Sequence, residues 1–198
     1  MDTLTLYIPE GYKLTEDQLL AVCERNDHLR IETDSEQNLI IMTPTGYDTG
    51  KYNSELLAEL VIWNRQKKNG VVFDSSTGFK LPDGSVKSPD VSWLPNSKAA
   101  SLSEEERKGF APVCPDFVVE LRPHTDSLSP LKEKMQQYIS NGCRLAWLLD
   151  PENRLAYIYR PDAQEEHMPI TSDTALSGED ILPGFVLNPA QLFDAENK

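Results

Sequence analysis

The sequence predicts an α/β fold, with a mixed β-sheet flanked by helices on both faces and preceded by a helix and a hairpin. The order strand, helix, strand over residues 117–149 indicates a right-handed parallel crossover. Several other short strand-like runs are separated by turns, which favours antiparallel pairing. Because 198 residues fit one domain, we expect a single domain over 1–198. Its parts are a core at about 40–160, an N-terminal helix and hairpin at 12–43, and a C-terminal appendage at 165–198.

The N-terminal region is expected to form one helix and one hairpin. Residues 12–26 contain Thr15, a suitable N-cap, followed by apolar residues at helical spacing. Two β-like runs, 29–33 and 38–43, are joined by a short polar segment, which is typical of a hairpin. This unit therefore precedes the main sheet.

The middle of the chain predicts a long helix and short strands. From about 49 to 69 apolar residues recur at a spacing of 3.6, and Gly70 stands at the C′ position expected for a helix end. Ser103 is followed by three glutamates, which indicates the first turn of a short surface helix. The strands expected between these helices lie at 71–74, 78–81 and 86–94.

The C-terminal half of the chain contains the run that is expected to be most deeply buried. Residues 117–121 are almost continuously apolar, as in a central strand covered on both faces. A helix over 128–141 ends at Gly142 and leads to a second apolar strand at 144–149. The later segments are an antiparallel neighbour at 155–160, an edge strand at 167–170, and a segment at 178–193 that packs back onto the body.

Composition and charge limit the classes of function. The formal net charge is −13, so the field of the whole molecule repels DNA, RNA and anionic membranes unless a basic patch or a divalent metal opposes it. No apolar run is long enough to span a membrane, and the N-terminus lacks a signal-peptide pattern. Three distant cysteines suit neither a disulfide framework nor a zinc site, which indicates a reducing cytoplasm. Motifs for nucleotide cradling and serine hydrolysis do not occur.

Two acidic residues lie in strands that are otherwise apolar. Asp90 follows Ser88-Pro89, and Glu120 lies within the run 117–121. A buried carboxylate is costly unless it is paired, so either acid alone favours a structural role, in an arginine pair or as a cap. Both together, on strands that can be adjacent, favour a shared divalent ion. Carboxylate ligands suit Mg²⁺ or Mn²⁺.

The segments around these acids belong to a longer ordered pattern. Ser-Pro-Asp-Val at 88–91 is followed by Pro-Asp-Phe-Val-Val-Glu-Leu at 115–121. This pair resembles the PD-(D/E)XK nuclease superfamily and, more narrowly, the Uma-two family of restriction-endonuclease-like proteins. Each further motif is weak, but together they follow the family's order from about 40 to 193. They are Thr43–Gly46, Trp63–Gln66, Ser76–Phe79, Lys134–Tyr138, Asn141–Cys143, Leu148–Pro151 and Leu182–Phe185.

The resemblance implies a restriction-endonuclease-like core and Mg²⁺-dependent hydrolysis of phosphodiester bonds in DNA. In this interpretation Asp90 and Glu120 hold the metal, which polarises the scissile phosphate and lowers the pKa of an attacking water. Glu55 matches the position of an accessory acid in the superfamily. A solvated charge is the alternative for Glu55, and Glu59 is a second candidate for the same role. The family also implies a homodimer.

The lysine of the superfamily pattern is displaced in this chain. Two residues after Glu120 the chain has Arg122, which can bind phosphate but cannot act as a base. In the family the lysine is on the following helix, where Lys134 matches. An ordinary solvent-exposed lysine is the alternative, and Lys132 is a reserve candidate. His124 is interpreted as a loop residue, with a phosphate contact as the alternative.

Three functions are consistent with the sequence. The first is a metal-dependent endonuclease, in which Asp90 and Glu120 are the metal ligands. Lys134 then orients or activates water, and Arg122 and Glu55 are assisting groups. The second is a binding module of the same fold that acts through protein–protein contacts, favoured by the negative charge and the missing lysine. The third is a hydrolase of a small phosphorylated substrate, because a fold does not determine a substrate.

Overall fold

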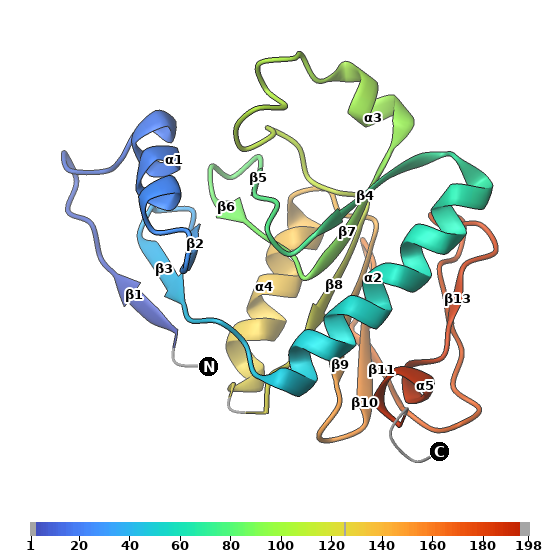
Figure 1. The fold of residues 1–198 in the computed structure, drawn as a ribbon. Helices are drawn as coiled ribbons and strands as arrows, with labels where there is room; N and C mark the ends of the chain where they lie inside the picture. Colours follow the sequence, from blue (N-terminus) through green and yellow to red (C-terminus); the bar gives the residue numbers. More distant parts are fainter. Residues whose placement is uncertain (1–2, 125, 195–198) are drawn as a thin grey trace.

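A six-stranded mixed sheet forms the centre of the computed structural model, which describes residues 3–124 and 126–194 (Figure 1). The strand order is β11-β10-β9-β8-β7-β4. Among the described strands of this sheet, only β8 and β9 pair in parallel, and α4 (Leu128–Ser140) connects them. The prediction of a mixed sheet with one parallel crossover is therefore confirmed. The strands are β4 (Gly70–Asp74), β7 (Val91–Pro95), β8 (Phe117–Leu121), β9 (Leu145–Asp150), β10 (Leu155–Tyr159) and β11 (Glu166–Pro169).

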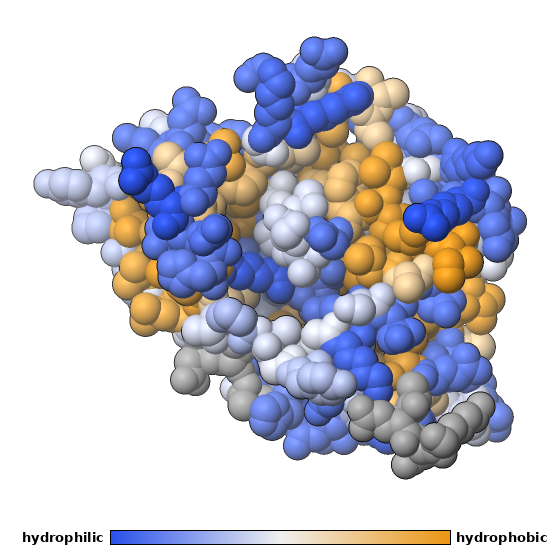
Figure 2. Space-filling model, viewed as in Figure 1, coloured by the Kyte–Doolittle hydropathy of each residue, from blue (hydrophilic) through white to orange (hydrophobic). Residues whose placement is uncertain are grey.

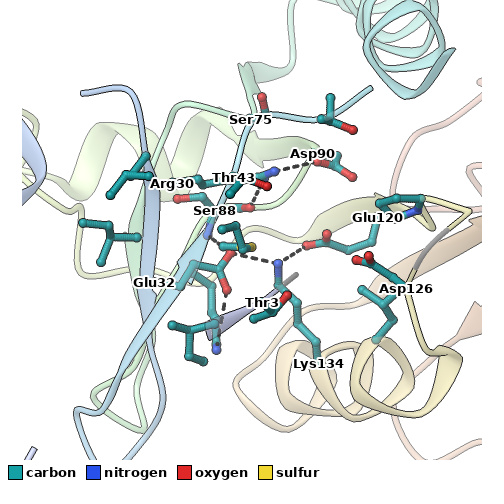
Figure 3. A pocket seen from close by; sticks show the side chains of 18 of the residues that line it. Thr3, Arg30, Glu32, Thr43, Ser75, Ser88, Asp90, Glu120, Asp126 and Lys134 are labelled. Atoms are coloured by element: carbon teal, nitrogen blue, oxygen red, sulfur yellow. Dashed lines mark hydrogen bonds and ion pairs between the residues drawn. The ribbon is translucent and has the colours of Figure 1, made fainter. Parts of the chain in front are cut away.

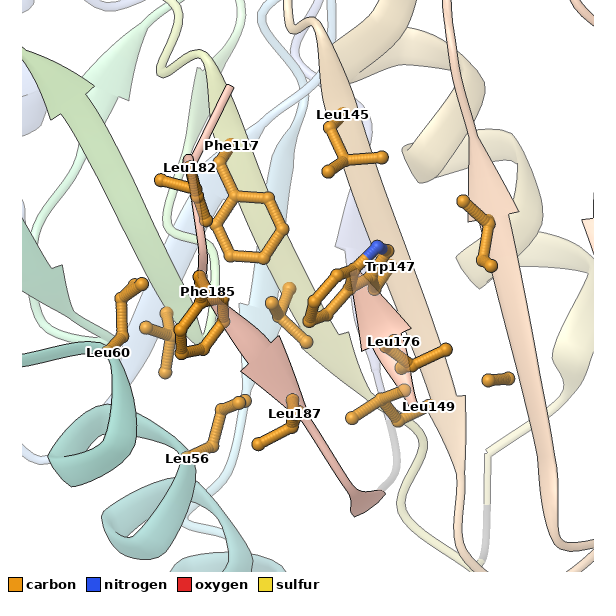
Figure 4. Close-up of a cluster of buried hydrophobic side chains, with 14 of the residues drawn as sticks. Leu56, Leu60, Phe117, Leu145, Trp147, Leu149, Leu176, Leu182, Phe185 and Leu187 are labelled. Atoms are coloured by element: carbon orange, nitrogen blue, oxygen red, sulfur yellow. The ribbon is translucent and has the colours of Figure 1, made fainter. Parts of the chain in front are cut away.

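One face of the sheet is covered by α2 (Tyr47–Lys67) and by the C-terminal segment. Alternate residues of β8, beginning with Phe117, point to this side, where they pack with Trp147 and Phe185 (Figure 4). The predicted return of the C-terminal segment to the body is thus confirmed. Its elements are β12 (Leu176–Ser177), β13 (Val186–Leu187) and α5 (Pro189–Phe193).

The opposite face of the sheet is covered by α4. Met135 and Tyr138 of this helix are fully buried and pack against Val118 of β8 and Leu148 of β9. Because side chains alternate along a strand, Glu120 points to the same side as Val118. The sheet therefore presents the carboxylate of Glu120 to α4.

The N-terminal unit consists of α1 (Glu16–Arg25) and a separate three-stranded sheet in the order β1-β3-β2. Its strands are β1 (Leu4–Leu6), β2 (Arg30–Thr33) and β3 (Leu39–Met42). Thr15 caps α1 in a capping box with Gln18, and β2 pairs with β3 as the predicted hairpin. Ile31 faces α1 and packs with Leu19 in a small core. Arg30 and Glu32 alternate with it and face the main body.

Three local expectations differ from the structure. Gly70 begins β4 and is not the C′ residue of a helix, because α2 ends in a left-handed Lys68 with φ of 54°. The predicted strand over 86–94 is divided into β6 (Val86–Lys87) and β7 by Ser88–Asp90. Ser103 and Glu106 form reciprocal hydrogen bonds, but only turns follow before Gly109. The short helix there is instead α3 (Asn96–Ser101).

Two further features complete the arrangement. A short pair of strands, β5 (Phe79–Lys80) and β6, lies between the main sheet and the N-terminal unit, and β6 contacts β2. Across residues 3–124 and 126–194, no helix combines the length and apolarity needed to span a membrane.

Candidate active site

A cavity of about 880 Å³ lies where the N-terminal unit meets the main sheet and α4. It is lined by polar side chains from strands that are far apart in the sequence. In the space-filling view, hydrophilic residues dominate the surface between the N-terminal unit and α2, where it is hollowed (Figure 2). The cavity lining includes the charged residues Arg30, Glu32, Lys87, Asp90, Glu120, Asp126 and Lys134.

The pairing of β7 with β8 brings two of the predicted residues together. In this antiparallel pair Val91 lies opposite Val119, so continuing the register by one residue places Asp90 opposite Glu120. Directly opposed side chains lie on the same face of a sheet. Both carboxylates are buried, at 6% and 3% exposed, and both line the cavity (Figure 3).

Asp90 is held by two donors from different parts of the chain. Its Oδ2 atom accepts the Leu121 backbone N–H at 2.8 Å, and its Oδ1 atom accepts from the Arg30 guanidinium at 2.9 Å. Arg30 also donates to the carbonyl oxygen of Ser88. The arginine partner considered in the sequence analysis therefore exists, and it comes from β2 of the N-terminal unit.

Glu120 is held by residues of α4. Its Oε1 atom accepts the Tyr138 hydroxyl at 2.9 Å and lies 2.8 Å from Nζ of Lys134. Burial is the largest influence on this carboxyl, and together with the neighbouring Asp90 it raises the pKa of Glu120 to about 7. The positive charge of Lys134 opposes this rise without overcoming it.

Lys134 bridges two carboxylates from opposite sides of the cavity. Besides Glu120, its Nζ atom contacts Oε1 of Glu32 at 2.8 Å (Figure 3). Burial lowers the pKa of Lys134, but the two carboxylates outweigh burial, so the pKa lies above its ordinary value. The ammonium therefore stays protonated near neutral pH.

Glu32 is the second buried glutamate of this cluster. It is only 2% exposed, and it also accepts the Ser88 backbone N–H at 3.0 Å and lies 3.6 Å from Nζ of Lys87. Burial raises the pKa of Glu32, but Lys134 and Lys87 outweigh it, so the pKa falls to about 2. Three cations and three carboxylates thus form one buried network.

The other residues proposed from the sequence lie elsewhere. Arg122 binds Oδ2 of Asp150 at 2.6 Å and does not line the cavity. Lys132 binds Glu165 at 2.5 Å and is also outside the cavity lining, so Lys134 is the lysine that the structure brings to Glu120. Three further residues are exposed and absent from the lining: Glu55, Glu59 and His124.

Three residues of the site were not predicted from the sequence: Arg30, Glu32 and Lys87. The segment Arg-Ile-Glu-Thr at 30–33 alternates polar and apolar residues, as any half-exposed hairpin strand does. Glu32 and Lys134 are 102 positions apart in the sequence, so no local spacing relates them. The only local signal is that two ionisable residues share the face of β2 opposite Ile31.

The oxygen atoms in the cavity suit a hard cation that keeps part of its water. Within the described residues, Oε2 of Glu120 has no hydrogen-bond donor, and each Asp90 oxygen accepts one hydrogen bond of the two that its lone pairs allow. No group of three or more His, Cys, Asp or Glu side chains in residues 3–124 and 126–194 is arranged to hold a metal. An ion here would therefore be held by Asp90, Glu120 and water, which is a coordination that Mg²⁺ accepts.

The mixed sheet, the flanking helices and the acid-rich cavity together define a restriction-endonuclease-like α/β protein. The sequence model of the Uma2 family, described as "Putative restriction endonuclease", matches residues 16–190. The chain therefore belongs to the Uma2 family, as the motif order predicted. A comparison with curated proteins gives no match.

A solved structure supports the fold assignment. Its title reads "Crystal structure of a putative nuclease belonging to DUF820 from Anabaena variabilis ATCC 29413". The two chains share 18% sequence identity, and the alignment covers 91% of this chain and 98% of that chain with a TM-score of 0.75. At this identity the similarity shows a common fold.

Proposed function

We propose that this protein is a metal-dependent endonuclease that hydrolyses phosphodiester bonds in DNA, with Mg²⁺ or Mn²⁺ held by Asp90 and Glu120. One observation carries the proposal. Two buried carboxylates, Asp90 directly before β7 and Glu120 on β8, line a single cavity with the ammonium of Lys134. Family membership and the nuclease title of the Anabaena protein give the same reaction class.

Each residue of the cluster has a distinct part in this proposal. When bound, the ion polarises the scissile phosphate and lowers the pKa of the attacking water. Lys134 stays protonated, so it donates a hydrogen bond to a phosphate oxygen and stabilises developing negative charge. This favours an orienting role for Lys134 over proton abstraction. Tyr138 and the Leu121 N–H fix the orientation of Glu120 and Asp90, respectively.

The negative charge of the whole molecule limits how DNA can bind. The net charge is −13, and three acids on the cavity rim, Asp27, Asp34 and Glu133, add to the repulsion. Arg30, Lys87 and Lys134 provide the positive charge inside the cavity, and a divalent ion would add to it. We therefore expect DNA binding to be weak without metal and strongly dependent on salt.

Nicking of a supercoiled plasmid in the presence of Mn²⁺ tests the proposal. The wild-type protein is expected to produce open circles, and Glu120→Ala is expected to produce none. Glu24→Ala, purified in the same way, is the control because Glu24 is an exposed residue of α1 outside the cavity lining. Cleavage that persists in Glu120→Ala would contradict the assignment.

A second candidate function is supported by the ion pair between Arg30 and Asp90. Because the guanidinium already neutralises Asp90, the cluster is electrically balanced without a metal. This favours a nuclease fold that has no catalytic activity and acts through protein–protein contacts. A protein of this kind would neither bind Mn²⁺ nor nick plasmid DNA, so the two candidates give opposite results.

We also infer a homodimer in the cytoplasm. The view in Figure 2 shows hydrophobic patches over the N-terminal unit and over α2. Exposed apolar side chains of these elements include Leu4, Leu6 and Ile62, and β1 is an outer strand whose free edge can pair with another chain. Light scattering would give twice the 22.3 kDa mass of one chain.

The cytoplasmic location is supported by the cysteines. All three are free thiols, which suits a reducing compartment.

A further inference from the structure

The contact between Glu32 and Lys134 connects the N-terminal unit to the candidate active site. Glu32 is on β2, whereas Lys134 is on α4 of the main body. Their side chains meet at 2.8 Å, with the carboxylate almost completely buried and the ammonium-bearing side chain 13% exposed. An ion pair this well buried is costly to form unless its geometry is favourable.

We propose that Glu32 is a positioning residue, which fixes the ammonium of Lys134 beside Glu120 so that its third N–H is available to the scissile phosphate. This inference rests on the proposed nuclease function, because it assigns a phosphate to the cavity. It makes the N-terminal unit a part of the active site. Neither the family assignment nor the fold similarity identifies such a residue.

The hydrogen-bonding capacity of Lys134 supports this arrangement. A lysine ammonium has three donors and no acceptor. Two of them are directed to oxygens of Glu32 and Glu120, each at 2.8 Å. Within residues 3–124 and 126–194 no third polar partner of Nζ occurs, and Lys134 lines the cavity. One donor therefore remains for a ligand.

Glu32 is itself held firmly enough to act as a reference point. Its Oε1 atom accepts the Ser88 backbone N–H, and its Oε2 atom faces Nζ of Lys87. Ser88 lies two residues before Asp90, so the same carboxylate also fixes the segment that leads to the proposed metal ligand. The four-carbon stem of a lysine is flexible, and Glu120 alone leaves Lys134 only one anchor.

A purely structural role for Glu32 makes different predictions. If Glu32 only neutralises charge where the two units meet, then any weakening of that contact should affect activity in a similar way. Thr33→Val supplies the matched control. The Thr33 hydroxyl accepts the Val86 backbone N–H at 2.8 Å, in a buried contact on the opposite face of the same strand. Its loss weakens the contact between the units without changing Lys134.

The first experiment observes the Lys134 ammonium directly, by proton–nitrogen correlation NMR of the metal-free protein. We expect a wild-type signal, identified by its loss in Lys134→Gln, that disappears in Glu32→Gln and persists in Thr33→Val. Glu32→Asp, which keeps the charge and shortens the side chain, serves if Glu32→Gln does not fold. An unchanged Lys134 signal in the Glu32 variant would overturn the proposal, as would the absence of this signal in the wild type.

The second experiment is a double-mutant cycle on Mn²⁺-dependent plasmid cleavage. Glu32→Gln is expected to lower kcat by about tenfold or more with little change in KM. In a Lys134→Gln background the same substitution should not lower kcat further, because Glu32 affects catalysis only by positioning Lys134. Independent, multiplicative losses would overturn the proposal.

The two experiments separate failure of the positioning role from failure of the nuclease function. If the wild-type protein cleaves nothing but the Lys134 signal depends on Glu32, then Glu32 does fix the ammonium, and the proposed function is wrong together with the role of that ammonium toward a phosphate. If the wild type cleaves DNA and the signal is unchanged in the Glu32 variant, the function stands and the positioning role is wrong.

Discussion

Two buried glutamates contact the same ammonium, yet their pKa values shift in opposite directions. The pKa of Glu32 falls from 4.5 to about 2, because Lys134 and Lys87 outweigh burial. The pKa of Glu120 rises from 4.5 to about 7, because burial and Asp90 outweigh Lys134. Replacing each acid by glutamine should therefore change the free energy of unfolding with opposite sign.

The magnitude follows from the size of each shift. One pKa unit corresponds to about 1.36 kcal/mol, so each shift is equivalent to about 3 kcal/mol. For Glu120 the folded state keeps a proton that the unfolded state releases between pH 4.5 and 7, so wild-type stability falls as pH rises through this window. Glu120→Gln removes the penalty and should be more stable than wild type at pH 8, by up to about 3 kcal/mol.

The sign for Glu32 is the reverse. Its ionised form is stabilised in the fold, so the contribution is present above pH 4.5 and is lost as pH falls toward 2. Glu32→Gln should therefore be less stable than wild type at pH 8, again by up to about 3 kcal/mol.

Urea unfolding of the three proteins at pH 8 and pH 5, with a chelator present, measures both effects. At pH 5 the advantage of Glu120→Gln should shrink to below about 1 kcal/mol. If both glutamine variants were destabilised at pH 8, or if the effect of Glu120→Gln were the same at both pH values, the electrostatic account of the cavity would be refuted.

Two further predictions concern residues whose positions the structure defines. Gly70→Ala should lower the free energy of unfolding by about 1–3 kcal/mol, because a Cβ atom there would lie 2.3 Å from the Trp93 indole. Urea titration measures this change, and an unchanged unfolding midpoint would contradict the packing. Lys134→Gln should lower Mn²⁺-dependent plasmid cleavage by about a hundredfold or more, whereas Lys132→Gln should leave it within about twofold because Lys132 is held by Glu165. Equal losses in the two variants would contradict the choice of lysine.

Much of the fold could be predicted because its signals are local. The capping box at Thr15, the hairpin of β2 and β3, and the strand–helix–strand unit from Phe117 to Asp150 all follow from spacing within a few residues. The edge strand β1 was not predicted. It has three residues that are largely exposed, so it shows little burial pattern.

Two misassigned positions show where local signals have more than one structural meaning. Gly70 has the residue type of a helix C′ position, but glycine is required there because a Cβ atom would lie 2.3 Å from the Trp93 indole and 2.5 Å from the Leu94 carbonyl oxygen. Ser103 and Glu106 make the hydrogen bonds of a capping box, yet no helix continues before Gly109. A cap alone does not supply the buried face that stabilises a short helix.

The candidate site was predictable only in part. Asp90 and Glu120 were identifiable because a charged residue within an apolar run is rare, although Asp90 lies just before β7 and not within a strand as predicted. Lys134 was identifiable because the motif order matched the family. Arg30 and Glu32 reach the site through tertiary packing of a separate sheet, which leaves no trace in sequence spacing. Their hydrogen bonds to the main body span 56 to 102 residues of sequence separation.

The central claim is that Asp90 and Glu120 together bind one divalent cation, and a calorimetric titration of Mn²⁺ tests it most directly. The account predicts one weak site in the wild-type protein, and no binding heat in Asp90→Ala or Glu120→Ala. Equal heats in the wild type and both variants would place the ion elsewhere, and the absence of heat in the wild type would remove the metal from the mechanism.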